Sequence, residues 1–255
     1  MKFLISANTD VGTVKSTNQD ALTVKTLNTP QGKMAFALLC DGMGGLQKGE
    51  VASATVIRAF ERWLYESFSK MCNGPITEEE LYHEWDNLVK TQNSAIRSYG
   101  EENGFQLGTT AVAILLTQTN YYVLNVGDSR AYEITDNVRQ LTTDQTLVAR
   151  EIALGNLSPE EEETDPRRNV LLQCIGASED VHIEFLVGDT REGAVYMLCS
   201  DGFRHEISKD EIYEKLQPDV MFSDESMRLG AAELTELVKQ RGERDNISVA
   251  LVRTF

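Results

Sequence analysis

Histidine, proline and basic residues are scarce in this sequence, and each scarcity argues against a class of protein. The 255 residues include only 3 histidines and 5 prolines, and 40 acidic residues outweigh 24 basic ones, for a formal net charge of −16. Binding to nucleic acid or to an anionic membrane is disfavoured, because both need clustered lysine and arginine. The histidines, His83, His182 and His205, are scattered, so zinc is a poor candidate metal.

Long apolar runs and paired cysteines are missing as well. No run approaches the roughly 20 residues that a membrane-spanning helix needs, and the N-terminal apolar segment is too short for a signal peptide. The four cysteines, Cys40, Cys72, Cys174 and Cys199, form no CxxC pair, and two of them lie in apolar runs. The sequence therefore predicts reduced core thiols and a cytoplasmic protein.

Several familiar catalytic loops are absent. The sequence contains no GxSxG elbow, no GxxxxGK[ST] loop and no HExxH pair. Their absence argues against a serine hydrolase of that type, a P-loop nucleotidase and a zinc protease. No internal repeat, low-complexity tract or Pro- or Ser-rich linker divides the chain, so we expect one domain over residues 1–255.

The strongest positive feature is an apolar run that ends in an acid and a glycine, and it occurs twice. The run 36–40 leads into Asp41-Gly42, and the run 196–199 leads through Ser200 into Asp201-Gly202. Asp128 and Asp245 are two more candidates of this kind. Each acid alone would most often belong to a turn. Together, four acids at strand ends indicate an oxygen-ligand site for hard divalent cations, since cations offset their mutual repulsion.

The order of the predicted elements indicates the fold class. Strands are expected at 3–7, 21–27, 33–40, 109–117, 121–126, 130–134, 138–141, 182–187, 194–199 and 246–253, and helices at 49–71, 77–101, 208–216 and 223–240. The four strands from 109 to 141 predict one antiparallel meander. Runs of strands separated by helix pairs do not fit strict βαβ alternation, so we expect an α+β fold, a four-layer α-β-β-α sandwich with two central antiparallel sheets. Residues 144–176 are expected to form a flap beside the site.

Seven segments, in chain order, carry a resemblance to a known family. They are Asp10–Asp20, Asp41–Ser53, Gly108–Ala111, Asn125–Tyr132, Leu141–Gln145, Leu198–Gly202 and Asp245–Val249. Their order and spacing resemble the metal-dependent protein phosphatase family, type 2C, in its bacterial form. The resemblance implies the sandwich fold expected above and a phosphatase for phosphoserine and phosphothreonine in proteins.

The resemblance also implies a role for each matching residue. Asp41 would bridge two Mn²⁺ or Mg²⁺ ions, and the Gly42 carbonyl would bind one of them. Asp201 and Asp245 would hold the other ion, and Asp20 would contact metal-bound water. A hydroxide shared by the two cations could attack phosphorus in line, without a covalent nucleophile.

Three positions depart from the family pattern. Lys15 stands where the family has a phosphate-binding arginine, and a lysine lacks the two-pronged grip of a guanidinium. Met43 follows Asp41-Gly42 where eukaryotic members have a histidine, which leaves the proton donor for the leaving group open. Asp128, with Asp201, would hold a third ion, but His205 takes the place of an acid that often supports that ion. The third site is therefore expected to be weaker.

The expected partners are phosphorylated proteins and a cognate Ser/Thr kinase, with no nucleic acid and no membrane, and a monomer is expected. Three alternatives remain open at this point. The chain could be a regulatory phosphatase for one dedicated partner, such as an anti-sigma-factor antagonist. It could be a catalytically weak pseudophosphatase that acts as a binding module, although such proteins usually lose their metal aspartates. It could also be a calcium-stabilised structural domain, although it has no EF-hand spacing.

Overall fold

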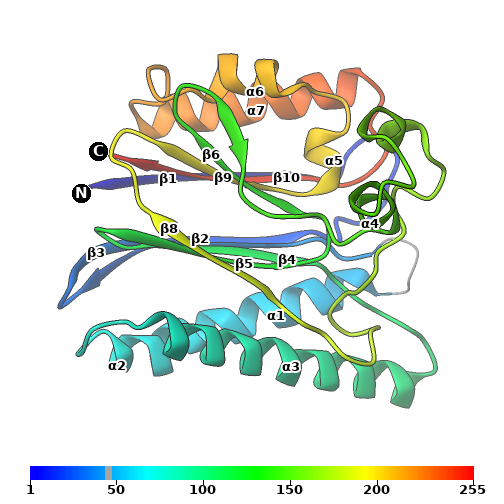
Figure 1. Ribbon diagram of the computed structural model, residues 1–255, viewed down its shortest axis with the longest axis horizontal. Helices are drawn as coiled ribbons and strands as arrows, with labels where there is room; N and C mark the ends of the chain where they lie inside the picture. The colour runs from blue at the N-terminus through cyan, green and yellow to red at the C-terminus, as the bar shows by residue number, and fades with distance from the viewer. Residues whose placement is uncertain (44–47) are drawn as a thin grey trace.

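Two facing sheets lie between two layers of helices (Figure 1). The computed structural model describes residues 1–43 and 48–255, apart from the Glu163 side chain. Gly44 and Gly45 of the matching segment that starts at Asp41 therefore lie outside the described residues. The first sheet contains, in spatial order, β1 (Phe3–Asp10), β10 (Ile247–Thr254), β9 (Val195–Cys199), β6 (Arg130–Ile134) and β7 (Val138–Gln140). The second contains β2 (Ala21–Thr29), β3 (Gly32–Cys40), β4 (Ala111–Leu116), β5 (Asn120–Val126) and β8 (Glu184–Asp189).

All neighbouring strands in both sheets pair antiparallel. The helices α1 (Gly49–Trp63) and α3 (Glu78–Asn103) cover the second sheet, and α6 (Lys209–Leu216) and α7 (Asp224–Gln240) cover the first (Figure 1). This arrangement confirms the expected α+β sandwich with two central antiparallel sheets.

Three apolar clusters fill the spaces between the four layers. Along β3, Phe36, Leu38 and Cys40 belong to the cluster that includes α1 and α3. The alternate residues, such as Ala37 and Leu39, belong to the cluster between the two sheets. Successive strand side chains point to opposite faces, so a strand that is covered on both sides must be apolar throughout. The third cluster joins the first sheet to α6 and α7.

Side-chain caps mark the starts of several helices. The long helix expected at 49–71 is continuous, but it changes type: α1 passes into a π-helical turn over Leu64–Phe68 and ends in α2 (Ser69–Met71). The Thr77 hydroxyl caps α3 by accepting a hydrogen bond from the backbone N–H of Glu80 at 3.2 Å. Ser208 and Ser223 cap α6 and α7 in the same way.

The meander predicted over residues 109–141 is wrong as a single unit. The strands β4 and β5 form one hairpin in the second sheet, whereas β6 and β7 form another hairpin in the first sheet. The chain crosses between the sheets at Gly127, whose φ of +109° is open to glycine but strained for other residues. A Cβ there would also lie 2.6 Å from Thr110 Cγ2. The crossing leaves Asp128 at the rim where the two sheets meet.

Candidate metal centre

Strand register places the acids of the second sheet at the same end of its strands. Ala21 pairs with Cys40, so Asp20, which precedes β2, lies beside Asp41, which follows β3. Ala111 pairs with Val126 in the same sheet, which places Asp128 at this end of the strands as well. Because neighbouring strands are antiparallel, the end of one strand lies beside the start of the next. Acids that are distant in sequence therefore become neighbours.

The first sheet contributes the other two acids. Cys199 of β9 pairs with Val249 of β10, and the Ser200 N–H donates to the Ser248 carbonyl at 3.1 Å. Asp201 begins the short helix α5 (Asp201–Arg204) directly after this point. Asp245 lies just before β10 starts at Ile247.

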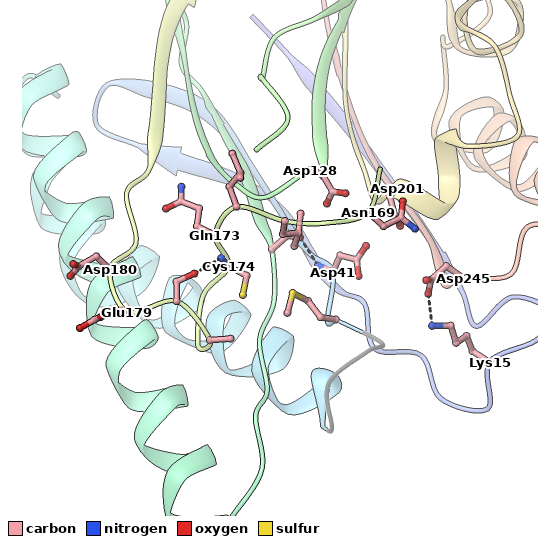
Figure 2. A pocket seen from close by; sticks show the side chains of 16 residues that line it. Lys15, Asp41, Asp128, Asn169, Gln173, Cys174, Glu179, Asp180, Asp201 and Asp245 are labelled. Atoms are coloured by element: carbon pink, nitrogen blue, oxygen red, sulfur yellow. Dashed lines mark hydrogen bonds and ion pairs between the residues drawn. The ribbon is translucent and has the colours of Figure 1, made fainter. Parts of the chain in front are cut away.

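Asp41, Asp128, Asp201 and Asp245 line one pocket of about 890 Å³, and Lys15 lines it too (Figure 2). We call it the acidic pocket. Asp20 is not among the lining residues, and both of its carboxylate oxygens are buried. The structure thus brings together, around one pocket, the acids that the sequence singled out at four separate places.

Hydrogen bonds from Thr109 and Thr110, directly before β4, hold the backbone of Asp41. The Asp41 N–H donates to Thr110 Oγ1 at 3.0 Å, and the Thr110 N–H donates to the Asp41 carbonyl at 2.9 Å. The Thr109 hydroxyl donates to the same carbonyl at 2.8 Å. At Gly42, a Cβ would lie 2.5 Å from the carbonyl oxygens of Gln19 and Gly49, so only glycine fits this close approach.

Burial and mutual repulsion dominate the electrostatics of these acids. Burial, with the nearby charge of Asp201, raises the pKa of Asp20 to about 7, although the hydroxyl of Ser248 opposes the shift. Burial and Asp201 also raise the pKa of Asp128 to about 7. Burial, followed by Asp20 and Asp201, raises the pKa of Asp41 well above its usual range. Divalent cations would offset both the cost of burying ionised acids and the repulsion between them, and so would favour the ionised forms.

Unpartnered oxygens test whether the residues fit such cations. Both carboxylate oxygens of Asp20 and Oδ1 of Asp201 are buried without a hydrogen-bond partner among the described residues. Ser200 and Ser248 lie close enough to lower the pKa of Asp20, but neither reaches hydrogen-bond geometry. Buried carboxylate oxygens without partners are costly, and oxygen ligands of this kind suit Mg²⁺ and Mn²⁺. The donor set therefore fits hard divalent cations. Within the described ranges, however, no three acid, histidine or cysteine side chains stand in a metal-binding arrangement.

Lys15 forms an ion pair with Asp245 at the acidic pocket. Its Nζ lies 3.1 Å from Oδ1 of Asp245, the contact drawn as a dashed line in Figure 2. The loop that carries Lys15 is tied down by Asn246. The Asn246 side chain accepts from the Gln19 N–H at 2.9 Å and donates to the carbonyls of Val11 and Thr17 at 2.9 and 3.1 Å.

Comparison with known proteins identifies the family of this chain. The family model described as protein phosphatase 2C matches residues 12–239. The chain belongs to the protein phosphatase 2C family. It is 31% identical over 226 residues to the serine/threonine phosphatase stp of Listeria innocua, covering 86% of this chain and 84% of that protein.

Solved structures of phosphatases have the same fold. The serine/threonine phosphatase of S. agalactiae superposes with a TM-score of 0.85 at 28% identity, and the match covers 100% of both chains. The catalytic domain of the phosphatase PstP, solved in complex with 2 manganese ions, superposes with a TM-score of 0.78 at 28% identity, covering 98% of this chain and 97% of that chain.

His205 differs from the acid expected in the family pattern, and it has acidic neighbours. Its Nδ1 lies 3.4 Å from Oε2 of Glu243, and its Nε2 lies 3.9 Å from Oδ2 of Asp201. Burial opposes ionisation of Glu243, but His205 and the backbone N–H groups of Asp245 and Arg244 lower its pKa. This phosphatase therefore has an imidazole next to Asp201, and both groups act on the pKa of Asp128.

Sequence reasoning missed part of this phosphatase site. Asn169, Leu172, Gln173 and Cys174 line the acidic pocket, yet none was singled out as a site residue. Their only signal was membership of the segment 144–176. The anchoring role of Asn246 was also missed, and its only signal was its place beside Asp245 in a matching motif. None of the described helices is long and apolar enough to cross a membrane.

Proposed function

We propose that this member of the protein phosphatase 2C family hydrolyses phosphoserine and phosphothreonine in proteins with the help of two divalent cations. The observation that carries the proposal is the set of buried aspartate oxygens without partners beside the acidic pocket. Cations bound there would act as Lewis acids that activate water and offset the charge of the phosphoryl group.

Each residue of the site has a proposed part in holding the ions. Asp41 and the Gly42 carbonyl would serve one ion, and Asp41, Asp201 and Asp245 would serve the second. Asp20, behind the pocket, would accept a hydrogen bond from water at the centre. Asp128, with Asp201, would hold a third and weaker ion, because His205 brings a donor where an acid would help.

Lys15 is proposed to bind the phosphate group. It lines the acidic pocket and carries a side chain that is 30% exposed, so a substrate can reach it. Its present partner, Asp245, is itself a proposed metal ligand. A cation on Asp245 would compete with this ion pair and favour the release of the ammonium group toward an incoming phosphate.

Residues 144–176 are proposed to act as a flap that selects substrates. The segment contains α4 (Leu147–Ala153) and a 3₁₀ turn over Pro159–Thr164, and its last part lines the acidic pocket. In Figure 1 it lies at the same end of the sheets as α5. Changes here should alter the choice of protein substrate more than the metal chemistry.

The wider setting is also a proposal. We infer one phosphatase domain over residues 1–255, acting as a monomer against a Ser/Thr kinase. A cytoplasmic location is supported by the four cysteines, which are all free and buried. A regulatory phosphatase for one dedicated partner is a second candidate. Retention of all the expected aspartates argues against a pseudophosphatase.

Phosphate release from phosphopeptides tests the proposal. The protein with Mn²⁺ or Mg²⁺ should release phosphate from phosphoserine and phosphothreonine peptides and from a chromogenic phosphate ester. A chelator should stop the reaction, and added metal should restore it. Hydrolysis that survives thorough chelation would contradict the proposed mechanism, and complete inactivity with both metals would favour a binding module.

A further inference from the structure

A second pocket, of about 590 Å³, adjoins the acidic pocket at Asn169, which lines both. Four basic side chains line this second pocket, which we call the arginine pocket: Arg130, Arg168, Arg204 and Lys209. Three carboxylates also line it, those of Asp144, Glu162 and Glu206. Among the described lining residues, four basic side chains thus accompany three carboxylates, in a chain whose net charge is −16.

Arg204 has donors that no described residue uses. Its Nη2 donates to Oδ2 of Asp144 at 3.3 Å and to the Asp128 carbonyl at 3.4 Å. Its Nε is buried without a hydrogen-bond partner among the described residues. A buried N–H of a charged group without an acceptor is costly, and a guanidinium matches the oxygen pairs of phosphate and carboxylate.

Asp144 does not satisfy Arg204, because Arg130 already holds both of its oxygens. Arg130 Nε and Nη2 donate to Oδ1 and Oδ2 of Asp144, each at 2.8 Å. Arg130 also lies 3.5 Å from Glu162. Arg204 is therefore the second cation on a single carboxylate, and it has capacity for another anion.

The helix α6 adds to the attraction. It begins at Lys209, with Ser208 as its N-cap, and both residues line the arginine pocket. Asp210 and Glu211 in the first turn of α6 already balance the partial positive charge of the helix start, so Lys209 is the group that this helix offers to an anion. Lys209 is exposed and has no ion-pair partner among the described residues, so it can turn toward a ligand.

We propose that the arginine pocket binds a phosphate-type oxyanion, held by Arg204 and Lys209. The site is tied to the acid centre through the chain itself. Arg130 follows Asp128 by two residues, and Arg204 follows Asp201 by three. An anion that engages Arg204 competes with the hydrogen bond to the Asp128 carbonyl, and so acts directly on the rim that carries the aspartates.

Two sources could supply this anion. One is inorganic phosphate, the product of the proposed reaction. The other is a second phosphorylated residue on a protein substrate whose first phosphate lies in the acidic pocket. Asn169 lines both pockets, so a substrate bound in the acidic pocket would have the arginine pocket as a neighbour.

Binding of inorganic phosphate to chelator-treated protein tests the pocket without any turnover. In that state the acidic pocket holds no cation to attract phosphate, and acidic side chains outnumber Lys15 among its lining residues, so phosphate binding that depends on Lys209 reports on the arginine pocket. We expect calorimetric titration to give a dissociation constant of about 1–10 mM. Lys209→Glu should weaken binding by at least about fivefold.

Lys70→Glu is the matched control. Lys70 is an exposed lysine in α2, in the opposite helical layer, and its substitution changes the net charge equally. Lys70→Glu should leave phosphate binding within about twofold of the unaltered protein. No phosphate binding, or equal weakening by both substitutions, would overturn the proposal.

The two sources are separated with the Mn²⁺-loaded enzyme, in measurements that rest on the proposed phosphatase activity. If a second substrate phosphate binds, a doubly phosphorylated peptide will have a higher kcat/KM than its singly phosphorylated form, and Lys209→Glu will remove this gain. If free phosphate binds, the two peptides will be alike, and millimolar phosphate will change the rate of the unaltered enzyme more than that of Lys209→Glu. An active enzyme with neither difference would contradict the proposal. An inactive one would count against the proposed function alone, because the chelated titration is independent of turnover.

Discussion

Asp128 and Asp144 are both buried near the same rim of the sheets, yet they meet opposite surroundings. Asp128 is 6% exposed and Asp144 is 9% exposed. Asp144 is gripped by Arg130 through two bonds of 2.8 Å and is approached by Arg204 at 3.3 Å. Asp128 lies beside Asp201, and burial with that neighbouring charge raises its pKa to about 7.

The two aspartates differ in how their charge is balanced. Arginines of the chain balance Asp144, whereas we propose that a bound cation balances Asp128. Asp144 receives its positive charge from the chain, so its environment is settled once the protein folds. We propose that bound cations supply most of the positive charge that Asp128, Asp41 and Asp20 need. Buried acids without cations cost stability, and proteins keep such groups mainly where they have a function.

The largest expected effect is on the acids proposed to bind cations, and above all on Asp41. Asp41→Asn keeps the shape of the side chain but removes the charge that would hold both cations. We expect the rate of phosphate-ester hydrolysis with Mn²⁺ to fall by at least about 10³-fold, because cation catalysis contributes several kcal/mol. Asp136→Asn, at an exposed turn, is the control and should keep full activity. An active Asp41→Asn enzyme would remove Asp41 from the centre.

The next effect is on the free energy of unfolding, which we expect Asp144→Asn and Asp128→Asn to change differently. Asp144→Asn leaves two largely buried arginines without their counter-charge, and should lower the free energy of unfolding by about 3–5 kcal/mol. Asp128→Asn should leave the stability of the chelated protein unchanged or raise it, because it removes a repelled charge. Urea unfolding of the two variants in chelator measures both. An equal loss of unfolding free energy in both variants would contradict the difference proposed between Asp144 and Asp128.

The pH dependence of stability sharpens the same contrast. The folded-state pKa of Asp20 is raised to about 7, against an unfolded value near 4. Between these values the folded state holds a proton that the unfolded state has lost, so stability falls as pH rises from about 4 to about 7. For the chelated protein this group alone should cost on the order of 3 kcal/mol over that range.

Thermal or urea unfolding at pH 5 and pH 8, with and without Mn²⁺, measures this effect. Bound Mn²⁺ should reduce the loss, since cations favour the ionised acids. Asp20→Asn in the chelated protein should also have a smaller loss than the unaltered protein. A chelated protein that is equally stable at both pH values would contradict the raised pKa.

The smallest effect is expected at Lys15, the only cation that lines the described acidic pocket. Lys15→Ala should raise KM for a small phosphate ester by about tenfold, equal to one charge-assisted contact of about 1.4 kcal/mol, with kcat less affected. Lys15→Arg should restore or improve binding, because guanidinium can grip two phosphate oxygens. An unchanged kcat/KM for Lys15→Ala would assign phosphate recognition to other residues.

Much of this protein follows from local sequence. The continuous apolar run of β3 required cover on both faces, because its alternate side chains point to opposite sides, and the caps at Thr77, Ser208 and Ser223 set where helices begin. The order of strand runs and helix pairs predicted the layered sandwich. The acids at 41, 128, 201 and 245 were found because a charge directly beside a buried strand is costly and therefore stands out.

Tertiary structure alone decided which of these groups meet. The crossing at Gly127 sends β5 and β6 into different sheets, and no local signal distinguishes that from a continued meander, because both need only a turn. The grip of Arg130 on Asp144 and the unused donors of Arg204 also depend on pairings between distant segments. Sequence determines the chemistry of each side chain and the period of each element, whereas strand register and sheet packing set the distances that make one aspartate part of the scaffold and another part of a site.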